Sequence, residues 1–347
     1  MTAVTPRPPC CKLRSFQEGR TVECSVTHEG DGWEPNVADQ QLRAVWSFWS
    51  KPYQGERRFT WTSELHHWLA WVLSVETAKQ HYPDTYLYTD DAGAEMLAGR
   101  LGLPFAHVST ALNALADCDP DWWALGKLYT YSLQSKPFVH IDADVFLWKP
   151  LPSRLECAAV FAQFPEPFIP GKSYYQPEQV ERVLRDYPQT WLPDEWSWYR
   201  RAAHAQRGEC CGILGGTNTG FIRHYANQAL QLVTEPFNQP GLRRLDDKRR
   251  HMVLIEQYLL AACIECHCRR AGSPHDGVDI AYLFESGAAA SNRDRLMQAG
   301  FTHLIADAKR NPVFARRLEA RVQRDYPEHY ARCVDGQRSF RSTTLPS

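Results

Sequence analysis

Two aspartates, Asp142 and Asp144, are separated by one alanine and come directly after the apolar run Phe138-Val-His-Ile. Two acids at the end of a buried strand repel each other and resist removal from water unless a cation compensates them. Mg²⁺ and Mn²⁺ take carboxylate oxygens as ligands together with substrate phosphates. The pair therefore predicts a metal site for a phosphate-bearing substrate, with two solvated turn residues as the alternative.

A regular alternation of strand and helix patterns leads up to this pair. Runs rich in β-branched and aromatic residues alternate with segments of helical periodicity. The predicted strands are 43–49, 85–89, 105–109 and 138–142, and the predicted helices are 63–81, 91–101 and 119–134. This order implies right-handed crossovers and a parallel sheet, in which ligands bind beyond the carboxyl ends of the strands. We therefore expect the site near Trp49, Asp90 and Asp142.

The second half of the chain is less regular. Helices are predicted near 177–187, 193–206, 223–234 and 251–266, around short strands near 158–162 and 211–222. The predicted fold class is α/β, with a mostly parallel, Rossmann-like sheet flanked by helices and a smaller subregion after it.

The unit of helix, strand and D-x-D pair between Trp123 and Pro150 resembles the nucleotide-sugar glycosyltransferases of the GT-A fold. It is most similar to the retaining enzymes of the glycogenin type (family 8). The resemblance covers about residues 42–314 and implies a nucleotide-sugar-binding half (41–152) and an acceptor and catalytic half of the same GT-A domain (153–330). The composition of the two ends, which lack periodicity, predicts a loose N-terminal arm (1–40) and a flexible tail (331–347).

A second motif supports the resemblance. These transferases carry H-x-x-G-x-x-K-P-W near the end of the domain, and here His303 and Lys309 keep the six-residue spacing. Ala306 replaces the glycine, and Arg310-Asn311 replace Pro-Trp. The resemblance implies that Asp142, Asp144 and His303 bind Mn²⁺ or Mg²⁺, and that Lys309 contacts the diphosphate.

The resemblance also implies contacts to the donor from the first half of the chain. Lys127 occupies the place of a Lys or Arg that lies near the nucleotide sugar, with a solvent-facing helix lysine as the alternative. The ends of the first strands would contact the base and ribose, through Ser47, Trp49 and Asp90.

Two later segments are expected on the sugar side. The Gly-rich stretch with Asn218 and Gly220 is similar to the N-x-G segment of the family, or is a plain turn before a helix. Glu256 and Gln257 resemble its D-Q helix, with Glu in place of Asp, or form a helix face toward water. Glu256 would be the general base of an inverting enzyme or would position the sugar in a retaining one. Asn218, Glu256 and Lys309 are thus the predicted catalytic residues.

The sequence thus predicts a metal-dependent glycosyltransferase that uses a nucleotide diphosphate sugar, most simply a UDP-sugar, with retention. The acceptor is open: a glycan, a protein, a lipid head group or a small molecule. One alternative is a metal-dependent nucleotidyltransferase, which uses the same paired acids. Another is an inactive protein of the same fold that binds nucleotide sugars.

Composition excludes several other classes. Lys and Arg number 39 against 40 Asp and Glu, so no nucleic-acid partner is expected. The first thirty residues contain no apolar run, and no later run reaches the ~20 residues that span a bilayer. A cytoplasmic protein with reduced thiols is therefore expected. Cys263, Cys266 and Cys268, with His267 and the pair Cys210-Cys211, leave a zinc site as a lesser alternative.

Overall fold

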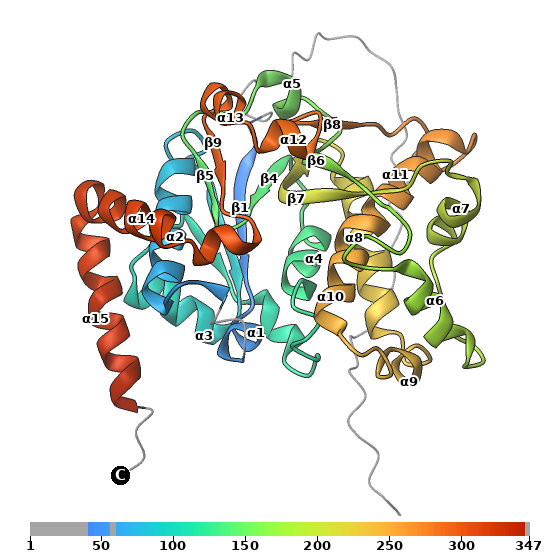
Figure 1. Ribbon diagram of the computed structural model, residues 1–347, viewed down its shortest axis with the longest axis horizontal. Helices are drawn as coiled ribbons and strands as arrows, with labels where there is room; N and C mark the ends of the chain where they lie inside the picture. Colours follow the sequence, from blue (N-terminus) through green and yellow to red (C-terminus); the bar gives the residue numbers. More distant parts are fainter. Residues whose placement is uncertain (1–40, 56–59, 344–347) are drawn as a thin grey trace, which may run out of the picture.

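The computed structural model describes residues 41–55 and 60–343, which form a twisted sheet between helices (Figure 1). Seven strands pair in the order β3-β2-β1-β4-β7-β6-β8, and a second sheet pairs two short strands. The strands of the large sheet are β1 (Arg43–Phe48), β2 (Thr85–Thr89), β3 (His107–Ser109), β4 (Phe138–Ile141), β6 (Val160–Pro167), β7 (Arg207–Gly216) and β8 (Ile280–Tyr282). The small sheet consists of β5 (Val145–Leu147) and β9 (Phe301–His303).

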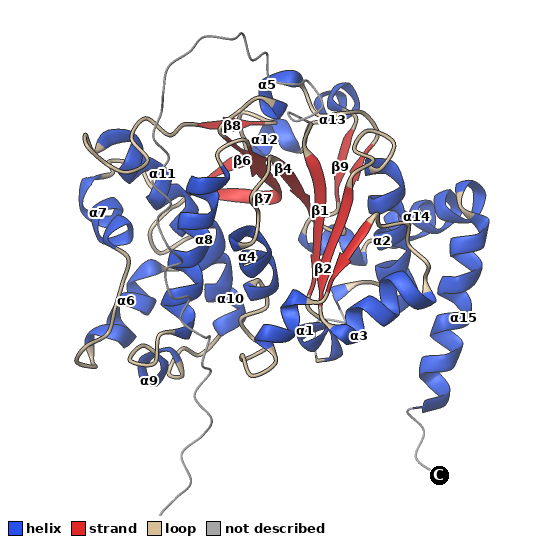
Figure 2. Ribbon diagram, turned by 180° about the vertical axis from the view of Figure 1, so that it is seen from behind, coloured by secondary structure: helices blue, strands red, loops and turns tan. Residues whose placement is uncertain are grey.

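Strand direction divides the large sheet unevenly. The pairs β1–β2, β1–β4, β2–β3 and β6–β8 are parallel. Among the strands of the described residues in this sheet, only β7 runs in the opposite direction, antiparallel to both β4 and β6. The predicted α/β fold class is confirmed, with a mostly parallel sheet flanked by helices (Figure 2).

Helices connect the strands and cover both faces of the sheet (Figures 1 and 2). Those before β6 are α1 (Ser50–Gln54), α2 (Glu64–Ala78), α3 (Asp91–Ala94), α4 (Leu125–Ser132) and α5 (Ser153–Glu156). Those after it are α6 (Pro177–Arg185), α7 (Asp194–Ala202), α8 (Thr219–Thr234), α9 (Gln239–Leu242), α10 (Lys248–Val253), α11 (Leu259–Arg269), α12 (Gly287–Ala290), α13 (Arg293–Ala299), α14 (Pro312–Asp325) and α15 (Pro327–Thr343). Two π-helical turns, η3 (Glu95–Arg100) and η5 (Leu254–Tyr258), and two 3₁₀ turns, η4 (Ala111–Leu115) and η6 (Ala306–Arg310), complete the order.

The core has two parts, one on each face of the sheet. Along β1, Ala44, Trp46 and Phe48 pack into the part that includes α2, whereas Val45 packs into the part that includes α4, α8 and α11. Strands buried on both faces are apolar throughout, which explains the unbroken apolar runs in the sequence. The sheet thereby fixes the ends of β1 and β4, where the predicted site lies.

The end of the chain differs from the expected flexible tail over 331–347. Helix α15 continues to Thr343, and residues 344–347 lie outside the described residues. Cys333 on this helix is fully buried, and the His329 ring hydrogen-bonds the Leu101 carbonyl at 3.0 Å. These contacts hold the segment against the domain, although its sequence is rich in charged residues. The predicted N-terminal arm, residues 1–40, lies outside the described residues.

Within residues 41–55 and 60–343, no helix combines the length and the apolar character that a bilayer crossing requires.

Candidate functional site

The predicted metal ligands come together at the carboxyl end of β4. Asp142 and Asp144 follow β4, and His303 ends β9; one ligand atom from each lies within 4.8 Å of the others. The β5–β9 ladder places Val145 opposite His303, and the Leu304 N–H donates to the Asp144 carbonyl at 3.0 Å. Pairing of two short strands thus brings His303 beside an acid pair that lies far from it in the sequence.

A buried amide orients the His303 ring. Its Nδ1 is 2.7 Å from the Oε1 of Gln163, which lies on β6. Because a carboxamide oxygen only accepts, Nδ1 carries the proton, and Nε2 keeps its lone pair. That Nε2 is 3.5 Å from the Asp144 carboxylate. Fixing the tautomer through the second nitrogen is the usual way in which proteins prepare a metal-binding histidine.

Gly212 on β7 leaves the space in which the ring lies. A Cβ at this position would be 2.4 Å from Gln163 Oε1 and 2.5 Å from two atoms of the His303 ring. Distances this short are not tolerated, so a residue with a side chain here would displace the histidine or its amide partner. The close packing of three strands thus determines the position of His303.

The two aspartates differ in their electrostatic surroundings. Burial raises the pKa of Asp142 to about 6, with Asp144 and Glu256 acting in the same direction and Lys127 opposing them. Burial also acts to raise the pKa of Asp144, but the Lys309 ammonium outweighs it and lowers that pKa well below its usual value. A divalent cation between the two would offset their mutual repulsion. Two carboxylates and one neutral imidazole form a donor set that fits Mn²⁺ or Mg²⁺.

Two lysines flank the acid pair from opposite sides. The buried Lys127 ammonium lies 2.8 Å from Asp142 and 2.8 Å from Glu256, and donates to the Cys211 carbonyl at 2.7 Å. Burial acts to lower the pKa of Lys127, but the carboxylates outweigh it and raise that pKa well above its usual value, so the lysine is a cation. On the other side, the Lys309 ammonium is 2.6 Å from Asp144.

These groups line a cavity of about 300 Å³, here called the first cavity. It lies at the carboxyl ends of β1 and β4, and its polar lining includes Asp142, Asp144, Lys127, Glu256, Gln257, His303 and Lys309. Aromatic rings form another part of the wall, from Trp49, Tyr53, Trp61 and Trp71. Concave sites with apolar walls and a few convergent polar groups are typical of small-molecule binding.

A family model described as a family of unknown function, DUF6734, matches residues 42–336. The chain belongs to this family. No curated protein matches the sequence.

Two solved structures are similar to this chain. One is the apo structure of the bifunctional glycosyltransferase WbbM, with a TM-score of 0.28 and 12% identity, over 64% of this chain and 39% of that one. The chain thus spans about two fifths of WbbM. The other is apo mouse xyloside xylosyltransferase 1, with a TM-score of 0.33 and 9% identity, over 77% of this chain and 98% of that one.

Ser47 and Trp49 line the first cavity as expected from their place at the end of β1, but Asp90 does not. Its carboxylate accepts hydrogen bonds from the Ser50 N–H and hydroxyl, at 2.9 and 2.8 Å, and from the Gly93 N–H at 2.8 Å. Asp90 therefore caps α3 and fixes the loop after β1. The structure therefore does not bring Asp90 to the first cavity, and its contact with the donor stays a prediction.

The segment with Asn218 and Gly220 lies at the opposite edge of the sheet. Because β7 is antiparallel to β4, Gly216 pairs with Phe138 at the start of β4, far from Asp142. The Asn218 side chain accepts from the Phe221 N–H at 3.0 Å and caps α8. The structure therefore does not bring Asn218 and Gly220 to the first cavity. The middle of β7, through Cys210, Cys211 and Gly212, borders the cavity instead.

Several residues of the site were not identified from the sequence. They are Gln163, which orients His303, and the cavity residues Tyr53, Trp61, His67, Trp71, Cys210, Cys211 and Gly212. Gln163 carries a detectable signal, because an amide inside the apolar run Val160-Phe-Ala-Gln-Phe needs a partner. The aromatic residues carry none, since aromatic rings on a helix usually indicate core packing.

Proposed function

We propose that this chain is a metal-dependent glycosyltransferase that transfers a sugar from a nucleotide diphosphate sugar, with a UDP-sugar as the expected donor. The observation that carries the proposal is the convergence of Asp142, Asp144, His303 and Lys309 at one wall of the first cavity. A folded domain has no structural need for two carboxylates, an oriented imidazole and an ammonium group at one place. A bound diphosphate with its cation requires this combination.

Each group of residues around the first cavity would have a separate role in the proposed reaction. Asp142, Asp144 and His303 would hold Mn²⁺ or Mg²⁺, which supplies Lewis-acid stabilisation of the departing diphosphate. Lys309, 2.6 Å from Asp144, would place a second positive charge on the same leaving oxygens. The rings of Trp49 and Trp61 would bind the base by stacking, in line with their place on the cavity wall.

Glu256 and Gln257 would act on the sugar side. Glu256 is buried, and its Oε1 already contacts the Lys127 ammonium at 2.8 Å. Such a group suits stabilisation of an oxocarbenium-like sugar better than proton abstraction, which favours retention over inversion. The buried Oε1 of Gln257 has no hydrogen-bond partner among the described residues, and a sugar hydroxyl would supply one.

The test is incubation of the full chain with a panel of nucleotide diphosphate sugars, with Mn²⁺ or with EDTA. Ligands that bind only the native state raise the melting temperature, so a Mn²⁺-dependent rise with one donor is expected. Asp144→Asn should abolish the rise, whereas Asp117→Asn, at an exposed position, should retain it. Stereochemistry at the transferred sugar, read by NMR, should show retention.

The products separate the alternatives. Release of a nucleoside diphosphate supports sugar transfer, whereas pyrophosphate would indicate nucleotidyl transfer and overturn the proposal. Donor binding without turnover against glycan, protein, lipid and small-molecule acceptors would favour a binding protein of the same fold. The acceptor class and the cytoplasmic location expected from the sequence stay predictions.

A further inference from the structure

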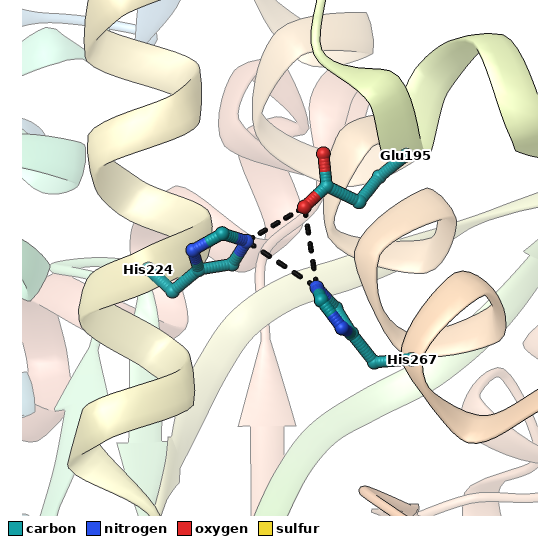
Figure 3. A group of neighbouring side chains, drawn as sticks. All are labelled: Glu195, His224 and His267. Atoms are coloured by element: carbon teal, nitrogen blue, oxygen red, sulfur yellow. Dashed lines mark hydrogen bonds and ion pairs between the residues drawn. The ribbon is translucent and has the colours of Figure 1, made fainter. Parts of the chain in front are cut away.

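A second cluster of metal-capable side chains lies outside the first cavity. Glu195 on α7, His224 on α8 and His267 on α11 point toward one another (Figure 3). His224 Nε2 is 2.7 Å and His267 Nε2 is 3.2 Å from the same Glu195 oxygen, and the two nitrogens are 3.3 Å apart. Three potential ligand atoms thus surround one point in space.

The cluster has its own cavity, of about 390 Å³, here called the second cavity. Its lining includes Glu195, His224 and His267, and it shares no residue with the lining of the first cavity. Asp194 and Arg270 in the lining carry opposite charges and offset each other. The chemistry of the site therefore rests on the carboxylate and the two imidazoles.

A neighbouring hydroxyl prepares Nε2 of His267. His267 Nδ1 is hydrogen-bonded to the Ser273 hydroxyl. With the Nδ1 proton donated to that oxygen, the Nε2 lone pair faces the cluster. The His275 ring centroid lies 5.0 Å from that of His224 and 5.2 Å from that of His267.

We propose that Glu195, His224 and His267 bind a zinc ion. Imidazole nitrogens with one carboxylate suit zinc, whereas Mg²⁺ and Ca²⁺ prefer oxygen ligands. A tetrahedral zinc with bonds of ~2.0–2.1 Å keeps its ligand atoms ~3.3 Å apart. Two of the three separations, 3.2 and 3.3 Å, already match this value. The third, between His224 and Glu195, opens by roughly 0.6 Å when the ion replaces their hydrogen bond.

The ion would connect three helices that are distant in the sequence. The three ligands come from α7, α8 and α11, which pack together on the side of the domain away from α15 (Figure 1). Because all three ligands line the second cavity, a water molecule there would complete a four-coordinate site. This ligand set differs from the cysteine cluster considered from the sequence: among the described residues, the groups that could hold a metal contain no cysteine. His267 is common to both, but Cys266 lines the cavity without a ligand atom in the group.

The test measures metal content and stability rather than transferase activity. The full chain is purified without chelators on a tag that carries no metal, and zinc is measured by mass spectrometry. We expect about one zinc ion per chain, and at least a fivefold loss of zinc in His224→Gln and in His267→Gln. Asp144→Asn removes a ligand of the first site and should keep its zinc, as should Cys266→Ser. Zn²⁺ added to the metal-stripped chain should raise its melting temperature.

Three results would overturn the proposal. The first is that Zn²⁺ does not change the melting temperature of the metal-stripped wild-type chain. The second is that Asp144→Asn loses as much zinc as the histidine variants do. The third is that Cys266→Ser loses that amount of zinc. Should a histidine variant fail to fold, Co²⁺ titration of the stripped wild-type chain replaces it. Visible bands of four-coordinate Co²⁺ without a thiolate charge-transfer band support the ligand set, and a thiolate band contradicts it.

Discussion

Gly212→Ala is the change that tests most directly how the fold positions His303. The added Cβ would lie 2.4 Å from Gln163 Oε1 and 2.5 Å from two ring atoms of His303. Ordinary contacts of a Cβ begin at 3.4 Å. The Gln163 amide and the His303 ring must therefore move away from the new Cβ by about 1 Å. That displacement is about half of a metal–nitrogen bond of ~2 Å. The imidazole would therefore lose its place as a metal ligand while keeping its chemical identity.

The expected size of the effect follows from two separate costs. Disturbing a group that orients a metal ligand weakens metal affinity ~10–100-fold. Forcing one extra methyl group into a packed strand interior destabilises the fold by ~1–3 kcal/mol. The first cost appears in Mn²⁺ binding and the second in unfolding without metal, so the two are measured independently.

The assay is calorimetric titration of Mn²⁺ into the metal-stripped chain, with denaturant unfolding measured in EDTA. Gly220→Ala is the matched control, because its added Cβ would lie 3.5 Å from Asn218 Oδ1, an ordinary contact, within helix α8. Unchanged Mn²⁺ affinity in Gly212→Ala, with the loss of stability present, would refute the role of Gly212 in positioning His303.

Three further predictions concern buried charge and helix capping. Lys127→Met leaves Asp142 and Glu256 without their shared cation. It should lower the free energy of unfolding of the metal-free protein by ~3–5 kcal/mol, measured with denaturant. The double variant Lys127→Met/Glu256→Gln should recover part of this stability. Burial raises the pKa of Glu209 from 4.5 to about 7. Between these two pH values the folded state keeps a proton that the unfolded state releases. The free energy of unfolding should therefore fall as the pH rises from 4.5 to about 7. Glu209→Gln should remove up to ~3 kcal/mol of this pH dependence, read from unfolding at pH 4 and pH 8; an unchanged profile would contradict the assignment. Asn218→Ala should cost ~1 kcal/mol of stability through loss of the α8 cap, with Mn²⁺-dependent donor binding unchanged.

The parts of the structure that depend on local pattern could be predicted from the sequence. The strand at 85–89 and the helix that begins after Ser63 follow from alternation and capping residues, and both are present. Asp142 could be placed at the carboxyl end of a parallel strand for the same reason. The juxtaposition of His303 with this pair was expected from the six-residue spacing to Lys309 and the resemblance that it carries, not from local pattern.

The parts of the predicted site that the structure places elsewhere depend on strand direction. The Gly-rich segment after β7 carries the right residue types for a ligand-binding turn, yet an antiparallel strand places it at the far edge. Nothing in the residues 207–216 distinguishes an antiparallel strand from a parallel one, because both bury the same apolar side chains. The second cluster was missed for a related reason: Glu195, His224 and His267 lie on three helices, and only tertiary packing brings them together.

The reversal of β7 also explains how Lys127 connects the two ends of the proposed reaction. Because β7 begins at the carboxyl end of β4, the Cys211 carbonyl lies where it can accept a hydrogen bond from Lys127. The same ammonium contacts Asp142, on the metal side, and Glu256, on the sugar side. A divalent cation at Asp142 would share that carboxylate with Lys127. Lys127 would thus connect the proposed metal ligands to the carboxylate on the proposed sugar side through two direct contacts, each of 2.8 Å.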